Sequence, residues 1–369
     1  MSRSPSPPGY PLAHITGVGL ITPLGADASH TWEALVDGRF INDHARIDPG
    51  KRACVTHFAL RAAEQAITAS THPPLQNAAI VVGTSKGPVE QWLNPQLQNA
   101  IASSFGLSSI AADLGRQLNI SGPRLTVSTA CASGLHALIR GAIMIETGEA
   151  SRVLVVAAEA SVHPMFIASF QRLGILPPPG FGCRPFDQDR QGFLMSEAAA
   201  AVVLEAEPSG EAVVIDRFAM GADATHLTRN SDQAIPLRNC IQRVVGSDPI
   251  DLIHAHGTGT DHNDATELAV LEHVFGARGS ERVGEAQPHI FSHKGALGHS
   301  LGAAGLVSVV LNVMSHRRSL IPPNIQTRNP MPAINVCLSN TPVPRPIHQS
   351  IAVAAGFGGQ IAAVHLRSD

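Results

Sequence analysis

The chain has few aromatic and few charged residues, and these shortages exclude several classes of protein. Aromatic residues make up 4% and charged residues 15% of the 369 residues, while hydrophobic residues make up 44%. The net charge is −3, so no basic excess exists to displace counterions, and nucleic acid is excluded as a main partner. We therefore expect a large buried core packed with small and aliphatic side chains.

The sequence also lacks the cysteine spacing of a disulfide framework and the long apolar run of a membrane segment. The five cysteines are odd in number, widely spaced and without CxxC spacing, which indicates a reducing cytoplasm. Residues 1–8 contain no apolar core, so we do not expect a signal peptide. The longest apolar stretch, Ala296–Met314, is interrupted by His299, Asn312 and several glycines and predicts a buried helix. We expect a soluble cytoplasmic protein with no membrane partner.

Short β-branched runs alternate with helical patterns along the chain. This alternation, with uninterrupted apolar strands, predicts an α/β architecture with sheets covered on both faces. The expected strands are His14–Ile21, Ala79–Gly83, Leu125–Thr129, Val153–Ala158, Ala199–Glu205, Val213–Ala219, Leu252–His256, His289–Ser292, Ile351–Ala355 and Ala362–Leu366. The expected helices are His30–Leu35, Phe58–Ala69, Ile110–Leu118, Cys131–Thr147, Asp264–Phe275 and Leu301–Ser315.

A weak internal repeat predicts two related halves. A strand, a turn of small residues and a long helix occur at Thr126–Glu146 and again at Ile290–Met314. The best boundary between the halves is the turn Pro208-Ser209-Gly210. We therefore predict an N-terminal half, residues 1–207, and a C-terminal half, residues 208–369.

Cys131 lies between a predicted strand and a predicted helix, within Thr129-Ala130-Cys131-Ala132-Ser133-Gly134. A sulfur at a helix N-terminus meets unpaired N–H groups and the macrodipole, which favour thiolate over thiol. Such a cysteine can attack a carbonyl carbon. The alternative is a small apolar residue that fills a tight turn, and for a lone cysteine this is the commoner case.

Two histidine-containing, glycine-rich turns occur in the second half, at His254-Ala255-His256-Gly257-Thr258 and at His293-Lys294-Gly295…Gly298-His299. A third glycine-rich turn, Gly356-Phe357-Gly358-Gly359, could cradle an oxyanion with its N–H groups. Each residue also has a structural alternative: buried histidines usually bond to backbone, and Asp264 with Glu267 could be an ordinary helix-start charge pair. His254, His262 and His293 raise the question of a metal, but no carboxylate or cysteine spacing completes such a site, and we expect no metal.

The ordered set of motifs resembles the β-ketoacyl-acyl carrier protein synthases, the elongating condensing enzymes of the thiolase fold. The resemblance covers nearly the whole chain. It includes the segments Ile15–Gly19, Thr22–Gly25, Ser128–Cys131, Ala158-Glu159, Arg184–Asp187, Gly192-Phe193, His256–Thr260, Lys294…His299 and Gly356–Gly359. It implies a thiolase-like fold of two related α/β halves in a layered α-β-α-β-α arrangement.

The resemblance also implies roles for individual residues. Cys131 would accept an acyl group from a carrier's phosphopantetheine, and His256 and His299 would promote decarboxylation of a malonyl thioester. The backbone amides of Cys131 and Phe357 would form the oxyanion hole. Lys294 would orient the site electrostatically, with Asp264 and Glu267 as supporting carboxylates. No cofactor or metal is implied. The expected partners are an acyl carrier protein and a second subunit, in a homodimer or a heterodimer with another synthase-like chain.

Departures from the family pattern leave other functions open. Ser308 stands where a glutamate is usual, and Gln360 replaces the customary threonine. The chain is also shortened between Phe40 and Phe58 and at Pro177–Gly182. A decarboxylative Claisen condensation in fatty-acid or polyketide-type biosynthesis, with a specialised role favoured, is the main expectation. The alternatives are an acyltransferase or malonyl decarboxylase on the same scaffold, or a non-condensing chain-length-type partner, which Cys131 opposes.

Overall fold

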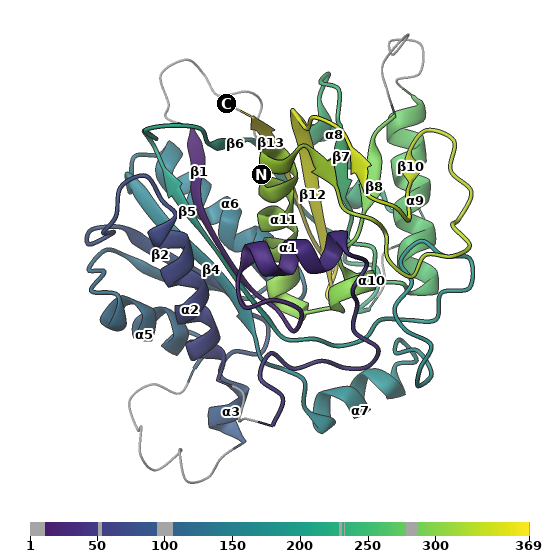
Figure 1. Cartoon of the computed structure of the whole chain (residues 1–369), viewed down its shortest axis with the longest axis horizontal. Helices are drawn as coiled ribbons and strands as arrows, with labels where there is room; N and C mark the ends of the chain where they lie inside the picture. Colours follow the sequence, from purple (N-terminus) through teal and green to yellow (C-terminus); the bar gives the residue numbers. More distant parts are fainter. Residues whose placement is uncertain are drawn as a thin grey trace.

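The computed structural model describes residues 12–50, 54–93, 106–228, 231, 233–277 and 287–368, and the Pro/Ser-rich N-terminal segment lies outside them. Within these ranges eleven strands form one sheet, in the order β10-β8-β7-β12-β13-β6-β1-β5-β4-β2-β3 (Figure 1). Their bounds are β1 Ala13–Ile21, β2 Ala79–Gly83, β3 Arg124–Val127, β4 Arg152–Glu159, β5 Ala198–Glu205, β6 Val213–Ala222, β7 Leu252–His254, β8 His289–Phe291, β10 Cys337–Leu338, β12 Gln349–Gly356 and β13 Gln360–Ser368. Two further short strands, β9 Leu320–Ile321 and β11 Val343–Pro344, pair separately.

Helices lie on both faces of the sheet, and two of them are buried inside the molecule. Their bounds are α1 Ala28–Val36, α2 Val55–Thr68, α3 Val89–Trp92, α5 Ser109–Gln117, α6 Ser133–Glu146, α7 Pro164–Arg172, α8 Ile235–Val245, α9 Asp261–Gly276, α10 Lys294–Leu297 and α11 Ala304–Arg318, with a 3-10 turn η1 at Leu301–Ala303. No helix in the described part of the chain is long and apolar enough to cross a membrane.

The order of strands repeats between the two ends of the sheet. One run is β1-β5-β4-β2-β3 and the other is β6-β13-β12-β7-β8, each with two antiparallel pairings followed by two parallel ones. The runs join where Ala13–Ile15 of β1 pairs with Val213–Ile215 of β6. The division into residues 1–207 and 208–369 stays a prediction, and its boundary falls between β5 and β6.

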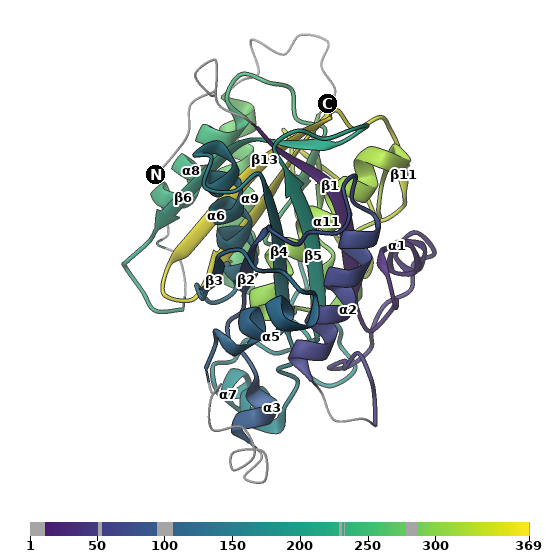
Figure 2. The ribbon, with the colours of Figure 1, turned by 90° about the vertical axis from the view of Figure 1, so that its left-hand side faces the viewer.

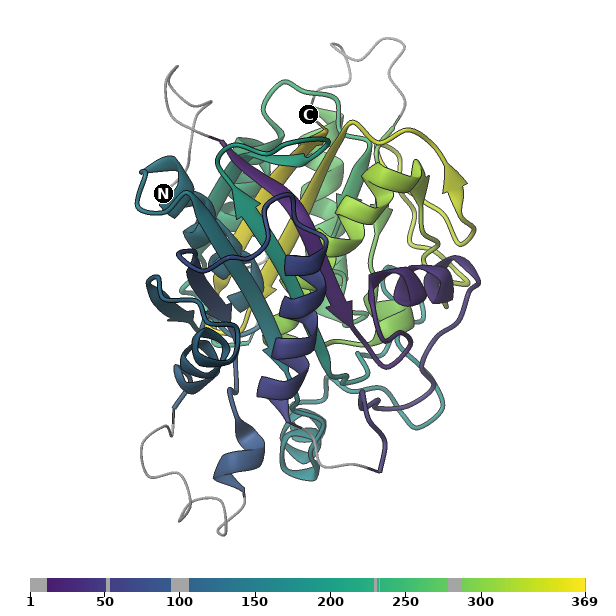
Figure 3. The same ribbon diagram turned by 60° about the vertical axis from the view of Figure 1, so that its left-hand side comes forward.

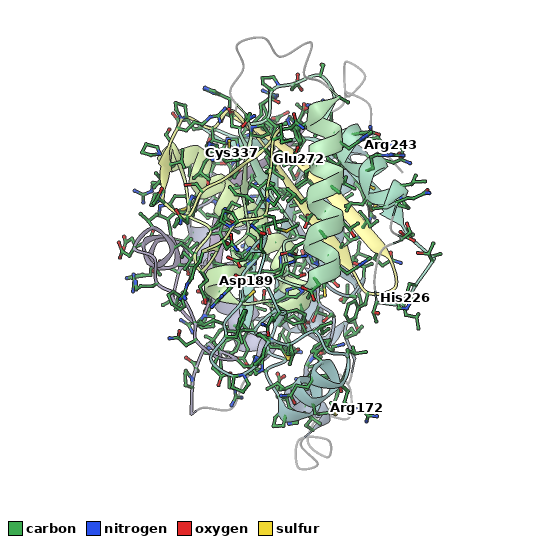
Figure 4. All side chains as sticks on the ribbon, turned by 90° about the vertical axis from the view of Figure 1, so that its right-hand side faces the viewer. Arg172, Asp189, His226, Arg243, Glu272 and Cys337 are labelled. Carbon is green, nitrogen blue, oxygen red and sulfur yellow. The ribbon has the colours of Figure 1, made fainter. Side chains whose placement is uncertain are left out.

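The elements stack in five layers, which confirms the layered α/β prediction. Helices α6 and α11 lie between the two runs of strands and pack on both of them (Figure 1). Helices α2 and α5 cover the outer face of the first run, where α2 crosses β1 and β5 (Figures 2 and 3). Helices α8 and α9 cover the outer face of the second run, where Arg243 and Glu272 lie on the outside (Figure 4). Each outer helix layer has its own hydrophobic core, and one further core surrounds α6 and α11 between the two runs.

The interior helices touch closely because glycine lies on each of them where they cross. A Cβ added to Gly134 of α6 would meet the backbone N of Leu306 on α11 at 2.7 Å, and one added to Gly305 would meet the side chain of Leu135 at 2.9 Å. Residues 304–315 of α11 are all buried, as expected for a helix that is apolar on every side. This crossing sets the position of the turn that leads into α6.

Most predicted elements are confirmed within a few residues, with informative exceptions. The predicted helix Leu301–Ser315 is instead η1 followed by α11, because the chain bends at the glycine-rich segment. Helix α6 starts at Ser133 rather than Cys131. Helices α3, α7, α8 and α10 were not predicted, because they are short or begin with proline near the start, and their apolar pattern is brief.

Candidate active site

One cavity of about 290 Å³ brings together side chains from both halves of the chain. Four of the predicted residues line it, namely Cys131, His256, His299 and Phe357. The lining includes apolar residues, Phe170, Ile175, Phe193 and Leu301, and polar residues, Thr258, Thr260 and Asn263. A thiol, two imidazoles and an apolar wall around one space can hold and react with an acyl thioester.

Cys131 reaches this cavity on a tight turn between β3 and α6. The preceding residue, Ala130, has a left-handed backbone with φ +49°, which costs roughly 1–2 kcal/mol for a residue with a side chain. Ser133 holds the turn, because its hydroxyl accepts the N–H of Thr129 at 2.9 Å and donates to the carbonyl of Ala130 at 2.6 Å. The strained turn therefore directs the sulfur into the cavity.

The thiolate expected for Cys131 is not the resting state of this site. Burial raises the pKa of the Cys131 thiol to about 11, although the charge of Lys294 and a hydrogen bond from the Phe357 backbone act to lower it. Desolvation outweighs the charge of the nearby Lys294 and the hydrogen bond from Phe357. Cys131 is a thiol at neutral pH, so an attack requires removal of its proton.

The two candidate histidines lie side by side in the cavity wall, with their rings edge to face. The ring centroids of His256 and His299 lie 5.6 Å apart at an interplanar angle of 80°, and Phe193 packs edge-on to His299 at 5.0 Å. Burial, followed by the positive charge of Lys294, keeps the pKa of both histidines well below the usual value. Both rings are therefore neutral at pH 7, and a neutral imidazole can donate one hydrogen bond to a developing oxyanion.

Lys294 does not line the cavity and is 1% exposed, so it is a buried cation and not a surface residue. Its ammonium donates to the main-chain carbonyl of His256. Burial lowers the pKa of Lys294, and the charge of Glu267 opposes that change. Ser308, at the position where a glutamate was expected, donates to the carbonyl of Ala304 at 3.1 Å within its own helix. The charge of Glu267 thus stabilises the ammonium of Lys294 more than that of any other group.

Asp264 and Glu267 on α9 fix the backbone of the turn after β7. Glu267 accepts the N–H groups of His256 and Gly257 at 2.7 and 2.8 Å. Asp264 accepts those of Thr258 and Phe186 at 2.9 and 2.7 Å. Both carboxylates are buried, and burial raises the pKa of each. They act on the geometry of the turn rather than on the contents of the cavity.

Two features of the site were not foreseen. Phe170 comes from α7, which was not predicted, and its ring stacks edge-on with Phe193 and Phe357 at 5.7 and 6.3 Å. Glu159 at the end of β4 accepts the hydroxyl of Thr84 at 2.6 Å and the N–H of Ser85 at 2.7 Å. In the sequence, Glu159 is notable only as part of a motif. Its place at the end of an apolar strand is the feature that could have predicted a buried carboxylate with polar partners.

No cluster able to hold a metal ion occurs in the described ranges. The three histidines considered for a metal have different surroundings. His262 lines the cavity, while His254 and His293 are hydrogen-bonded to each other at 2.9 Å.

Family models and known proteins match the chain over most of its length. The model of the beta-ketoacyl synthase N-terminal domain matches residues 41–209, and that of the C-terminal domain matches residues 212–328. "Putative polyketide beta-ketoacyl synthase 1" of Streptomyces cyaneus is 29% identical over 95% of this chain and 97% of its own length. The 3-oxoacyl-acyl-carrier-protein synthase 2 of Vibrio cholerae is 27% identical over 88% of this chain and 90% of its own length.

Solved structures share the fold. A chain from the complex of a type II polyketide synthase acyl-carrier protein with its ketosynthase superposes with a TM-score of 0.85 at 22% identity, covering 98% of this chain and all of the other. A chain from the complex of a ketosynthase with its chain length factor from Xenorhabdus doucetiae superposes with a TM-score of 0.80 at 24% identity, covering 99% of this chain and all of the other.

Proposed function

This chain belongs to the β-ketoacyl synthase family, and from that premise we propose that it catalyses decarboxylative condensation of a carrier-bound malonyl unit with an acyl group held on Cys131. The observation that carries the proposal is the single cavity lined by Cys131, His256, His299 and Phe357. These are a nucleophile, two neutral donors and the backbone N–H of Phe357, which reaches the sulfur of Cys131, and together they meet the needs of acyl transfer.

The first step loads the acyl group. The sulfur of Cys131 attacks the carbonyl carbon of an acyl thioester, the new C–S bond forms, and the bond to the carrier's thiol breaks. The proton of Cys131 passes to the departing thiol, so the step is neutral overall. Main-chain N–H groups of Cys131 and Phe357 stabilise the oxyanion, in keeping with the hydrogen bond that the Phe357 backbone gives to the sulfur.

The second step joins two carbons. The bond between the malonyl carboxylate and its α-carbon breaks and releases carbon dioxide, and its electron pair forms an enolate. His256 and His299 stabilise the enolate oxygen as neutral donors. The α-carbon then attacks the acyl carbonyl, the C–S bond to Cys131 breaks, and the sulfur takes up one proton because its pKa is about 11. Lys294 contributes positive charge near both histidines.

We infer that the carrier is an acyl carrier protein and that the chain pairs with a second synthase-like subunit. In support, β3 pairs only with β2 among the described strands, so its outer edge is open beside Cys131. Related structures contain an acyl-carrier protein or a chain length factor. The five cysteines are all free thiols, which suits a reducing cytoplasm. Fatty-acid and polyketide relatives both occur, and the unusual Ser308 favours specialised biosynthesis.

The related complexes with chain length factors also favour a second candidate, a partner subunit without condensing activity. Mass spectrometry after incubation with an acyl-carrier thioester separates the two. We expect a covalent acyl adduct on Cys131 that is absent from Cys131→Ala, and a chain without the adduct would not be a condensing enzyme.

Condensation is then tested by carbon dioxide release from malonyl-carrier. Release should fall to background in His256→Ala and in His299→Ala, while His273→Ala, on the exposed side of α9, keeps the rate of the unmodified chain. Persistent release in the first two variants would refute the assigned roles. An unmodified chain that forms the adduct but releases no carbon dioxide would favour the acyltransferase alternative.

A further inference from the structure

A row of buried polar side chains runs behind the cavity and takes no part in the steps above. It consists of Asn312, His254 and His293, each 0–1% exposed. The Nδ1 atom of His254 lies 2.9 Å from Oδ1 of Asn312, and its Nε2 atom lies 2.9 Å from Nδ1 of His293. None of the three lines the cavity.

The direction of every hydrogen bond in this row follows from one main-chain carbonyl. The amide nitrogen of Asn312 lies 3.2 Å from the carbonyl oxygen of Ile351, and a carbonyl can only accept. The amide oxygen of Asn312 therefore faces His254, whose Nδ1 must carry the hydrogen. Burial lowers the pKa of His254 to about 3, so the ring is neutral and its Nε2 is an acceptor. His293 must then donate from Nδ1.

This assignment leaves Nε2 of His293 as a bare, buried lone pair, without a hydrogen-bond partner in the described structure. Burial and the adjacent charge of Lys294 hold the pKa of His293 well below its usual value, so this ring is also neutral. Two imidazoles are thus fixed in one tautomer each. The unpaired buried nitrogen of His293 carries a cost in stability that the fold retains.

The row connects the three segments that carry the candidate site residues. His254 ends β7 two residues before His256, and His293 immediately precedes Lys294. Asn312 lies on α11, the helix that follows His299. Lys294 also donates to the carbonyl of His256, so the turn at 293–294 holds the end of β7 at two points. Loss of the row would free His256 and Lys294 to move relative to each other.

We propose that His254 and His293 are positioning residues for the condensing reaction, setting the placement of His256 and Lys294 relative to His299. The inference rests on the proposed function. Neither side chain reaches the cavity, so each acts through the backbone segments that it joins. A displacement of about 1 Å at reacting groups can reduce a rate by about 100-fold, which sets the scale of the expected effect.

The kinetic test compares three variants in carbon dioxide release from malonyl-carrier. His293→Ala removes the donor to His254 and should lower kcat about 10- to 100-fold with KM unchanged. His293→Asn returns an N–H at the place of Nδ1 and should recover kcat to within about fivefold. The matched control is His289→Ala, at the start of β8 and outside the row, which should retain full kcat.

Alkylation of Cys131 by iodoacetamide should change much less than kcat in these variants, because the row does not touch the sulfur and Lys294 keeps its charge. Full kcat in His293→Ala, failure of His293→Asn to recover, or an equal loss of alkylation would each overturn the positioning role.

A measurement without turnover keeps the proposal testable if His293→Ala does not fold. Histidine-selective 15N NMR of the unmodified chain should show His254 and His293 as neutral Nδ1–H tautomers, unchanged between about pH 6 and 8. An Nε2–H tautomer at His254, or titration of either ring in that range, would overturn the proposal. If the unmodified chain releases no carbon dioxide, the proposed function fails, and this spectrum still decides whether the row exists as described.

Discussion

The carboxylate of Glu267 accepts the main-chain N–H of His256 at 2.7 Å, so a buried anion on α9 holds the backbone of a histidine that lines the cavity. The same carboxylate accepts the N–H of Gly257 and is the leading electrostatic partner of Lys294. One side chain therefore governs both the position of His256 and the charge behind it.

Glu267→Gln should reduce carbon dioxide release about 10-fold or more, because an amide can accept from only one of the two N–H groups and carries no charge for Lys294. The free energy of unfolding should fall by about 1–3 kcal/mol, measured by denaturant titration.

The matched control for that substitution is Glu272→Gln on the same helix. Glu272 accepts the N–H groups of Ile334 and Asn335 on the outer face of the molecule, where Figure 4 labels it. Its rate of release should equal that of the unmodified chain. Equal losses in both variants would show that the effect belongs to α9 in general.

The reaction of Cys131 with iodoacetamide should rise with pH over the whole range from about 7 to 9. The pKa of the thiol is raised to about 11, so the thiolate fraction grows about 10-fold per pH unit throughout that range. Lys294→Met should slow the reaction most near pH 7, because burial lowers the pKa of Lys294 to about 8 and its charge, which lowers the pKa of the thiol, is lost above that pH. A plateau below pH 8 would contradict the desolvated thiol.

Ser308→Ala should leave carbon dioxide release within about twofold and the free energy of unfolding within about 1 kcal/mol. The hydroxyl bonds only to the carbonyl of Ala304 within α11 in the described contacts. A loss of activity above tenfold would place Ser308 in the electrostatic network of Lys294.

Gly134→Ala should destabilise the fold by about 1–3 kcal/mol and slow acylation of Cys131, because the added Cβ would meet the backbone of α11 at 2.7 Å. Gly141→Ala, on the same helix, meets the end of the Val155 side chain instead and should cost less. Thermal unfolding of both variants makes the comparison, and a larger loss in Gly141→Ala would refute the role of the crossing.

The sequence predicts best those features that depend on local pattern. The predicted strand Ala79–Gly83 has the observed bounds. An apolar run this short, between polar segments, predicts a buried strand because it is too short for a helix. Helix α8 was not predicted, because proline near its start and scattered arginines hide the apolar face that packs on β6 and β13. The predicted site residues of the two halves could be placed in one cavity only through the fold.

The sequence does not predict properties that depend on burial, such as the pKa of a thiol or the hydrogen-bond partner of a histidine. The helix start near Cys131 indicated a thiolate, yet desolvation by segments distant in sequence reverses that preference. The pairing of His254 with His293 depends on a separation of 39 residues and on the orientation of Asn312. In the sequence, these two histidines are notable only because they lie next to the motifs that contain His256 and Lys294.

The buried position of α11 has a consequence for any attempt to divide the molecule. This helix belongs to the second half but packs on β5 and β1 of the first as well as on β12 of its own. Each half produced alone would present an apolar helix face to water and would aggregate. Fragments ending at 207 and starting at 208 should therefore become competent only when expressed together, so the two runs of strands are not separable modules.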